Sequence, residues 1–245
     1  MLEVTGLRKS FGALRASDGI DFDVREGETH AVIGPNGAGK TTFIGQLAGT
    51  LRPDAGRIVF AGEDVTALPA PRRARKGLSR SFQITSIYRE FTVLENVCIA
   101  VQACSGHGFR FWRRAFSDDS LVLPARKILE ELGLAGRRDV PAANLSHGEQ
   151  RQLEVAMALA TRPRLLLLDE PMAGMGAEES QRMIAFLASL KRRHAIILVE
   201  HDMDAVFRLA DRISVLVYGR VIATDTPERI RANEDVRRAY LGEDS

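Results

Sequence analysis

Residues 34–41 limit the folds open to this chain more than any other feature. They fit the pattern G-x-x-x-x-G-K-[ST] and lie between an apolar segment that predicts a strand, residues 29–33, and a segment that predicts a helix, residues 39–49. Glycines let a backbone wrap closely around phosphate groups, so that successive N–H groups and the start of the helix point at the anion. We therefore predict a loop that binds a nucleoside triphosphate, with Lys40 at the β- and γ-phosphates and the Thr41 hydroxyl on Mg²⁺. The residues expected to contact the nucleotide here are Gly34, Pro35, Asn36, Gly37, Ala38, Gly39, Lys40, Thr41 and Thr42.

The alternation of segments after residue 145 predicts an α/β fold. Strand-like apolar segments at 165–168, 196–199 and 213–217 are separated by segments that predict helices. Strands that alternate with helices form a largely parallel sheet with crossover connections. The chain has 245 residues, 45% hydrophobic and 27% charged, which suits one folded domain. We predict a phosphate-loop NTPase core with a mostly parallel sheet and a small β subdomain at the N-terminus.

The middle of the chain has a different character. Between residues 84 and 144 there are few strand-like segments, and residues 124–134 predict a helix that begins at Pro124. We expect a helical subdomain over about 84–149, inserted into an α/β core formed by residues 1–83 and 150–245 of a single domain. An aromatic and basic insertion at 106–116 is expected to be a packed loop with a charged edge, and a contact with a membrane subunit or the bilayer surface is the alternative. The basic segment 72–76 is expected to be an exposed polar connection.

Several function classes are disfavoured by composition. The formal net charge of +2 gives no sign of nucleic-acid binding, and Cys98 and Cys104 are too few for a disulfide framework. We expect reduced, buried thiols. The first residues carry no secretory signal, and the longest apolar segments are far shorter than the ~18 residues of a membrane span. These features favour a soluble, cytosolic protein.

Two carboxylates follow the apolar strand at 165–168. Asp169 and Glu170 stand at its carboxyl end, where open α/β sheets bind their ligands. Such a pair can also cap a helix. Because a phosphate loop is also present, we expect Asp169 to orient the ligands of Mg²⁺ and Glu170 to polarise the attacking water as the general base.

A serine-containing segment, 145–150, precedes a helix with periodic apolar residues. Its sequence is Leu-Ser-His-Gly-Glu-Gln, which predicts Ser146 as the N-cap and Glu149 as the partner in a capping box. An N-cap serine also leaves helix N–H groups directed at an anion. The segment therefore fits both a structural and a phosphate-binding role.

Five motifs in this order resemble the ATP-binding cassette ATPases of ABC transporters. They are the phosphate loop, Gln83 within Ser-Phe-Gln, the Leu-Ser-x-Gly-Glu-Gln segment, Leu-Leu-Asp-Glu-Pro, and His201. The resemblance covers nearly the whole chain. It implies ATP and Mg²⁺ as ligands and ATP hydrolysis coupled to transport.

The resemblance also implies roles for single residues. Gln83 would reach the Mg²⁺ and the water, and His201 would contact the γ-phosphate. Ser146, Gly148 and Glu149 would bind the ATP of a second ATPase subunit in a head-to-tail dimer. Phe11 would stack on adenine, although an ordinary core aromatic is the alternative for that residue.

The chain departs from the family at two positions. His147 stands where the family usually has a second glycine in its Leu-Ser-x-Gly segment, and Gly176 stands where the family often has aspartate. The first position varies within the family. The second departure puts in question a carboxylate contact from this loop to the partner subunit.

Flanking segments indicate a branch of the family. Segments 80–83, 91–97, 200–203 and 239–242 are similar to the ATPase subunits of bacterial branched-chain amino acid importers. This implies a peripheral protein at the cytoplasmic face of the inner (plasma) membrane. Its partners would be a second ATPase subunit, identical or related, transmembrane permease subunits and, indirectly, a periplasmic solute-binding protein.

Three other functional classes are alternatives. The C-terminal segment also resembles the lipopolysaccharide-export ATPase, which is the main alternative. A cassette ATPase acting on nucleic acid or ribosomes is disfavoured by the single phosphate loop and the absence of sustained heptads. A small GTPase or a nucleoside kinase does not account for residues 145–150.

Overall fold

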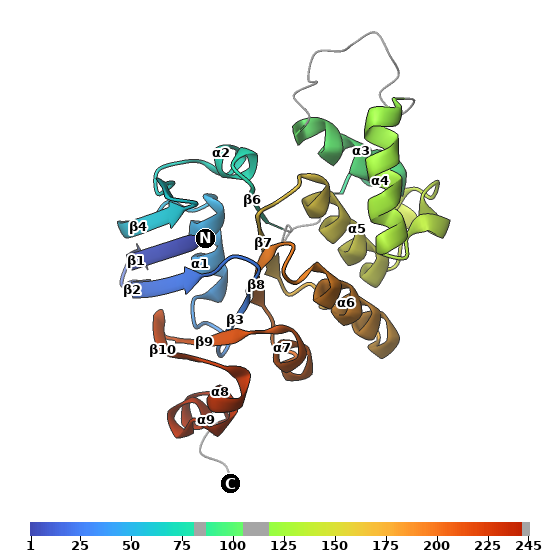
Figure 1. Cartoon of the computed structure of the whole chain (residues 1–245). Helices are drawn as coiled ribbons and strands as arrows, with labels where there is room; N and C mark the ends of the chain where they lie inside the picture. Colours follow the sequence, from blue (N-terminus) through green and yellow to red (C-terminus); the bar gives the residue numbers. More distant parts are fainter. Residues whose placement is uncertain (81–86, 105–117, 242–245) are drawn as a thin grey trace.

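The computed structural model describes residues 1–80, 87–104 and 118–241, and it contains two sheets (Figure 1). The N-terminal sheet is antiparallel, with strand order β2-β1-β4-β5. Its strands are β1 (Leu2–Phe11), β2 (Leu14–Val24), β4 (Ala55–Phe60) and β5 (Glu63–Asp64). This sheet confirms the predicted small β subdomain.

The second sheet has the order β10-β9-β3-β8-β7-β6 and is largely parallel. Strands β9 to β6 pair in parallel, and β10 runs antiparallel at the edge. The bounds are β3 (Thr29–Ile33), β6 (Leu78–Arg80), β7 (Leu165–Asp169), β8 (Ala195–Val199), β9 (Arg212–Val217) and β10 (Arg220–Asp225). The α/β prediction is confirmed.

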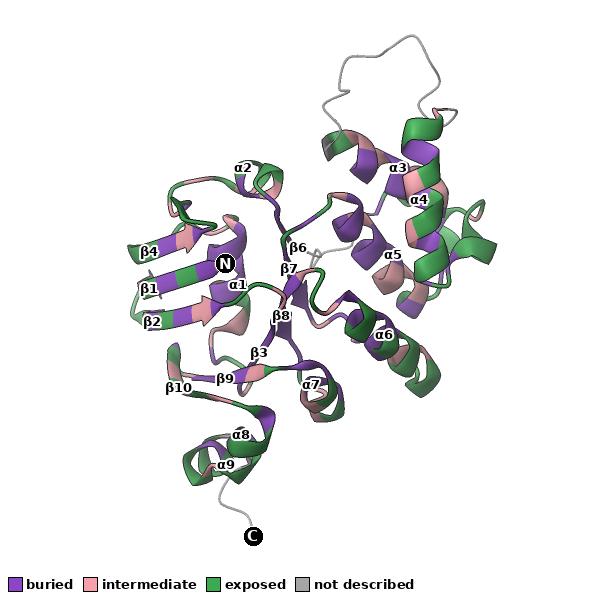
Figure 2. Ribbon diagram, in the orientation of Figure 1, coloured by how far each residue is buried: buried purple, intermediate pink, exposed green. Residues whose placement is uncertain are grey.

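The leucine-rich strand β7 is buried on both faces of the sheet. Leu165 and Leu167 pack with α1 (Lys40–Ala48) and the N-terminal sheet. Leu166 and Leu168 pack on the opposite side, with the helices of the other half of the molecule. Because neighbouring strand residues point to opposite faces, a strand covered on both sides needs a continuous apolar run rather than an alternating one. Figure 2 shows the burial of this central layer.

Helices cover the sheet on the side away from the N-terminal sheet. These are α3 (Val93–Cys104), α4 (Asp119–Glu131), α5 (His147–Ala160) and α6 (Ala177–Leu190), which share one hydrophobic cluster with the inner strands. The short α7 (Met203–Leu209), α8 (Pro227–Ala232) and α9 (Glu234–Leu241) form another cluster with β9 (Figure 1). Helix α5 runs across the expected subdomain boundary at 149/150, and that boundary stays a prediction.

The predicted start of α4 at Pro124 is wrong. The helix begins at Asp119, and Pro124 lies inside it. The Asp118 carboxylate caps the helix by accepting the Ser120 N–H at 3.0 Å. An aspartate cap outweighs the missing N–H of one proline in the second turn, so the helix starts earlier than the proline suggests.

The basic segment 72–76 is only in part the exposed connection that we expected, because Arg72, Arg75 and Lys76 are exposed whereas Arg73 is buried. Residues 70–75 form helix α2 (Ala70–Arg75), and Arg73 is only 1% exposed. Its guanidinium donates to four backbone oxygens, those of Gln46 and Leu47 at 2.7 Å each, Leu68 at 2.9 Å and Thr66 at 3.0 Å. Carbonyls at the end of α1 lack helical partners and attract a cation, which explains the burial of this arginine.

The Cys98 thiol is buried and free, as predicted, and burial raises its pKa to about 11. The insertion at 106–116 lies outside the described residues. Among the helices that the structure describes, none has the length and apolar composition of a membrane span.

Candidate nucleotide site

The predicted phosphate loop lies between the carboxyl end of β3 and the start of α1. Two of its glycines are required by close backbone approach. A Cβ at Gly34 would lie 2.0 Å from the Leu216 oxygen, and one at Gly39 would lie 2.2 Å from the Ala16 oxygen. Gly39 also has φ 102° as the N-cap of α1. The surrounding strands therefore fix the path of this loop and exclude side chains at both positions.

Lys40 is held over the loop. Its Nζ donates to the oxygens of Gly34 at 2.6 Å and Pro35 at 3.1 Å. Burial lowers the pKa of Lys40, and the charges of Glu170 and Asp169 oppose this shift. The ammonium group is thus within electrostatic range of both carboxylates, and the Thr41 side chain beside it is exposed to solvent.

Asp169 ends strand β7 and is 5% exposed. Its Oδ2 accepts a hydrogen bond from Nη2 of Arg80 at 2.9 Å. Burial raises the pKa of Asp169, and the Arg80 charge opposes the rise. Arg80 is a site residue that the sequence motifs did not predict. The signal available was its position at the end of β6, the strand that pairs in parallel with β7.

Glu170 and His201 follow neighbouring strands, β7 and β8, and the structure brings them together. The His201 Nδ1 lies 3.8 Å from the Glu170 Oε1. Glu170 has φ 50°, a left-handed conformation that is unusual for a residue with a side chain, and its N–H donates to the Val199 oxygen at 2.8 Å. Both side chains remain accessible, with exposures of 43% for Glu170 and 64% for His201.

Phe11 is at the end of β1, in the turn before β2, and is 50% exposed. The alternative of a core aromatic is therefore wrong. The Lys9 ammonium lies 5.6 Å from the centre of its ring. An exposed ring of this kind can stack on a planar base.

Ser146, Gly148 and Glu149 lie at the start of α5 rather than on the loop after β3. The capping box is confirmed, because the Glu149 N–H donates to the Ser146 Oγ at 3.2 Å and the Ser146 N–H donates to the Glu149 Oε2 at 2.9 Å. Gly148 is buried beneath α6, since a Cβ there would lie 2.4 Å from the Glu179 Oε2. Gln83 lies outside the described residues.

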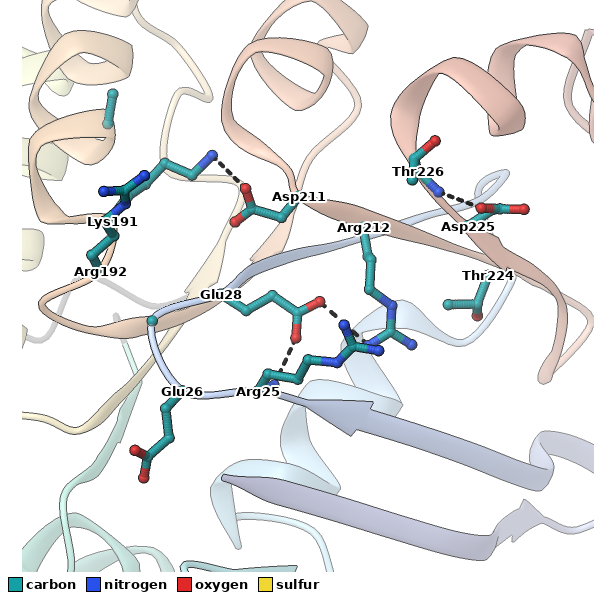
Figure 3. Close-up of a pocket in the computed structure, with 12 residues that line it drawn as sticks. Arg25, Glu26, Glu28, Lys191, Arg192, Asp211, Arg212, Thr224, Asp225 and Thr226 are labelled. Atoms are coloured by element: carbon teal, nitrogen blue, oxygen red, sulfur yellow. Dashed lines mark hydrogen bonds and ion pairs between the residues drawn. The ribbon is translucent and has the colours of Figure 1, made fainter.

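A cavity of about 810 Å³ lies at the opposite, amino-terminal edge of the sheet (Figure 3). Charged groups beside the starts of β3 and β9 line it, and four of the lining residues form ion pairs within it. Lys191 contacts Asp211 at 2.9 Å, and Arg212 contacts Glu28 at 3.3 Å. Because the phosphate loop is at the other edge of the sheet, this cavity is separate from the candidate nucleotide site.

Comparisons with known proteins agree with these motifs. The profile of the family described as ABC transporter matches residues 17–173, and one described as branched-chain amino acid ATP-binding cassette transporter matches residues 220–245. The high-affinity branched-chain amino acid transport ATP-binding protein BraF of Pseudomonas aeruginosa is 40% identical over an alignment of 250 residues, which covers 99% of this chain and 98% of that protein. The protein of the same description from Escherichia coli, LivG, is 39% identical over 252 residues, with coverage of 99% and 98%.

Solved structures show the same likeness. The ADP conformation of MJ1267, an ATP-binding cassette of an ABC transporter, has a TM-score of 0.87 at 30% identity and covers 99% of both chains. A nucleotide-free ATP-binding cassette from an ABC transporter has a TM-score of 0.87 at 29% identity, again over 99% of both chains. The resemblance seen in the sequence is confirmed, and the chain belongs to the ABC transporter family as one of its ATP-binding subunits.

Proposed function

We propose that this ATPase powers a bacterial importer of branched-chain amino acids. The observation that carries the ATPase chemistry is the position of Glu170 against His201, within electrostatic range of Lys40. Support for the solute class comes from relatives that are 39–40% identical over nearly their whole length. The C-terminal profile match over residues 220–245 favours the same branch over a lipopolysaccharide-export ATPase.

The phosphate loop would bind ATP through its backbone N–H groups, with Lys40 at the β- and γ-phosphates. The available donors fit Mg²⁺, because Thr41 offers an exposed hydroxyl and Asp169 a carboxylate, and both are hard oxygen ligands. Gln83 would complete this set. Bound Mg²⁺ would neutralise charge on the phosphates, while Arg80 holds the Asp169 carboxylate in place.

Glu170 would act as the general base for the attacking water. Its accessible carboxylate lies at the sheet edge that carries the loop, and His201 beside it would contact the γ-phosphate. The strained backbone of Glu170 fixes the direction in which this side chain leaves the strand. Phe11 would stack on adenine at the side of the N-terminal sheet.

Ser146, Gly148 and Glu149 would bind the ATP held by a second ATPase subunit, identical or related to this one. The N-terminus of α5 carries backbone N–H groups that can bind an anion. The capping box holds Ser146 at the N-cap position, next to these groups. When two subunits associate head to tail with C₂ symmetry, each would complete the ATP site of the other, so that both sites form at the same time.

The membrane subunits would dock near the start of α3. Tyr88 and Phe91 are 52% and 38% exposed, and their ring centres are 5.6 Å apart. Paired exposed aromatics are typical of a contact surface rather than of a core. The protein would therefore lie peripherally at the cytoplasmic face of the inner membrane, with the periplasmic binding protein as an indirect partner.

The substitution Glu170→Gln tests the proposed chemistry, because it keeps the shape of the side chain and removes its basicity. We expect ATP hydrolysis to fall by about 10²–10⁴ while ATP binding is retained. Glu178→Gln is the matched control, since that side chain is 85% exposed on α6. Hydrolysis by Glu170→Gln at a rate near that of the wild type would contradict the assignment.

A further inference from the structure

One buried carboxylate, that of Glu200, is not used by the mechanism above. Glu200 directly follows β8 and is 1% exposed. Among the described residues, it forms no ion pair with a lysine or arginine, and the only basic side chain with a nitrogen within 4.0 Å of its carboxylate is His201. A carboxylate removed from water without a cation must be held by hydrogen bonds, so the identity of its donors shows what it does.

The donors of Glu200 come from two different loops. Its Oε1 accepts the N–H of Met172 at 2.9 Å, in the loop after β7. Its Oε2 accepts the N–H groups of His201 at 3.0 Å and Asp202 at 3.5 Å, in the loop after β8. One side chain therefore joins the loop that carries Glu170 to the loop that carries His201.

This connection fixes the strained backbone of Glu170 from its carboxyl side. On the amino side, the Glu170 N–H already donates to the Val199 oxygen at 2.8 Å. Two residues further along, the Glu200 carboxylate holds Met172. A left-handed conformation, here with φ 50°, persists only when the surroundings hold it on both sides.

Glu200 also faces the imidazole. The His201 Nδ1 lies 3.8 Å from the Glu200 Oε2 and 3.8 Å from the Glu170 Oε1. The ring is thus placed between a buried carboxylate and an accessible one. The accessible one, Glu170, is also within electrostatic range of Lys40.

We infer that Glu200 is a positioning residue for ATP hydrolysis, which keeps Glu170 and His201 in register across β7 and β8. The inference rests on the proposed role of Glu170 as the general base. Glu200 acts through the other two residues and does not touch the reacting atoms. An amide at position 200 has one oxygen for donors from two loops, and its NH₂ group opposes one of them.

The test is steady-state ATP hydrolysis by the full-length Glu200→Gln variant. We expect kcat to fall by about tenfold while the KM for ATP changes by less than about twofold, since misplacement affects the transition state more than binding. Glu28→Gln is the matched control. Glu28 is also buried (6% exposed) and accepts a backbone N–H, that of Arg25 at 2.6 Å, but it lies at the other edge of the sheet (Figure 3). Its kcat should stay within about twofold of the wild type.

A mutant cycle separates positioning from a general loss of structure. Because Glu200 acts through Glu170 and His201, adding Glu200→Gln to a variant that carries both Glu170→Gln and His201→Ala should change the residual rate by less than about twofold. A purely structural role would slow both backgrounds equally and overturn the inference. Wild-type kcat in Glu200→Gln, with Glu170→Gln inactive, would overturn it too and leave the proposed function intact. Full activity in Glu170→Gln would instead overturn the proposed function.

Amide hydrogen exchange on the wild-type protein gives a reading that needs no variant. The Met172 N–H should be protected well beyond the N–H of the exposed Gly174 in the same loop. Exchange of both amides at the same rate would overturn the inference even where Glu200→Gln does not fold.

Discussion

At the scale of single residues, Arg73 has a structural role that the basic segment around it does not suggest. Its neighbours in the basic segment are exposed, whereas its own guanidinium is enclosed by carbonyl groups from α1 and from the connection after β5. It thereby anchors the C-terminal end of the helix whose N-terminus forms the phosphate loop. A change at Arg73 should affect stability first and the nucleotide site through α1.

Arg73→Met should lower the free energy of unfolding by about 3–5 kcal/mol, because two buried and two part-buried carbonyls lose their charged donor at once. Urea unfolding at pH 7 measures this, with an unchanged m-value as the sign of a two-state comparison. Arg72→Met, the same change at an exposed position in the same helix, should stay within about 0.5 kcal/mol. Equal stability of the two variants would show that the buried contacts are not important.

At the scale of elements, the strands and the longer helices of the core were predictable from apolar runs and motif context. The helix after the phosphate loop and strands β3, β7 and β8 fall where apolar periodicity places them. Less predictable were elements fixed by distant partners. Helix α2 depends on the Arg73 contacts with α1, and β10 pairs with β9 with only intermediate burial on alternate residues. Such partners are not visible in a local pattern.

The site follows the same rule. Motif residues on the loop, at the ends of β7 and β8, and at the start of α5 were found from spacing and resemblance. Arg80 and Glu200 were not, because each acts through a neighbouring strand rather than through a motif of its own. Only parallel pairing brings these side chains to Asp169 and to the Glu170 loop.

A buried histidine connects three strands of the second sheet. The His30 ring is fully buried, with Nδ1 2.8 Å from the Asp23 oxygen and Nε2 2.8 Å from the Ser214 Oγ, which in turn lies 2.7 Å from the Thr224 Oγ1. A carbonyl can only accept, so Nδ1 carries the proton and Nε2 accepts from Ser214. Burial, reinforced by the nearby Arg212 charge, lowers the pKa of His30 to about 4.

This network predicts acid sensitivity. The pKa of His30 is lower in the folded than in the unfolded protein, so protonation of this residue favours unfolding. The stability that neutral His30 contributes is therefore lost as the pH falls from about 6.5 toward 4. Between pH 7 and pH 5 the loss should be about 2 kcal/mol. Urea unfolding at both pH values measures this loss. In His30→Gln, the decrease in the free energy of unfolding between pH 7 and pH 5 should be smaller than in the wild type by about 2 kcal/mol. An identical pH slope in the two proteins would contradict the prediction.

At the scale of the whole molecule, the proposed nucleotide site and the proposed docking surface for the membrane subunits lie in different regions. The residues proposed to bind the subunit's own nucleotide lie at the carboxyl edge of the second sheet and at the end of β1, whereas Tyr88 and Phe91 directly precede α3 of the helical region. Figure 1 shows α3 and α4 on the side of the second sheet away from β1, β2 and β4. Closure around ATP would move that helical region relative to the core and carry the permease with it.

Tyr88→Ala should separate hydrolysis from uptake. In vesicles that contain the permease and the binding protein, we expect leucine uptake to fall at least about fivefold, while ATP binding changes by less than about twofold. The control Leu123→Ala removes an apolar side chain that is 60% exposed on α4 of the same region. Normal uptake by Tyr88→Ala would place the docking surface elsewhere.

If each ATP site is built from two subunits, as proposed, then two variants that are inactive alone should restore activity when they are mixed. Lys40→Ala removes the loop cation, and Ser146→Arg blocks the start of α5. Each variant alone should lack ATP hydrolysis. In an equal mixture, half of the pairs have one intact composite site, so at most about a quarter of the wild-type rate should return. If no ratio of the two variants restores hydrolysis, while each still folds and the Ser146→Arg variant still binds ATP, the shared-site account is contradicted.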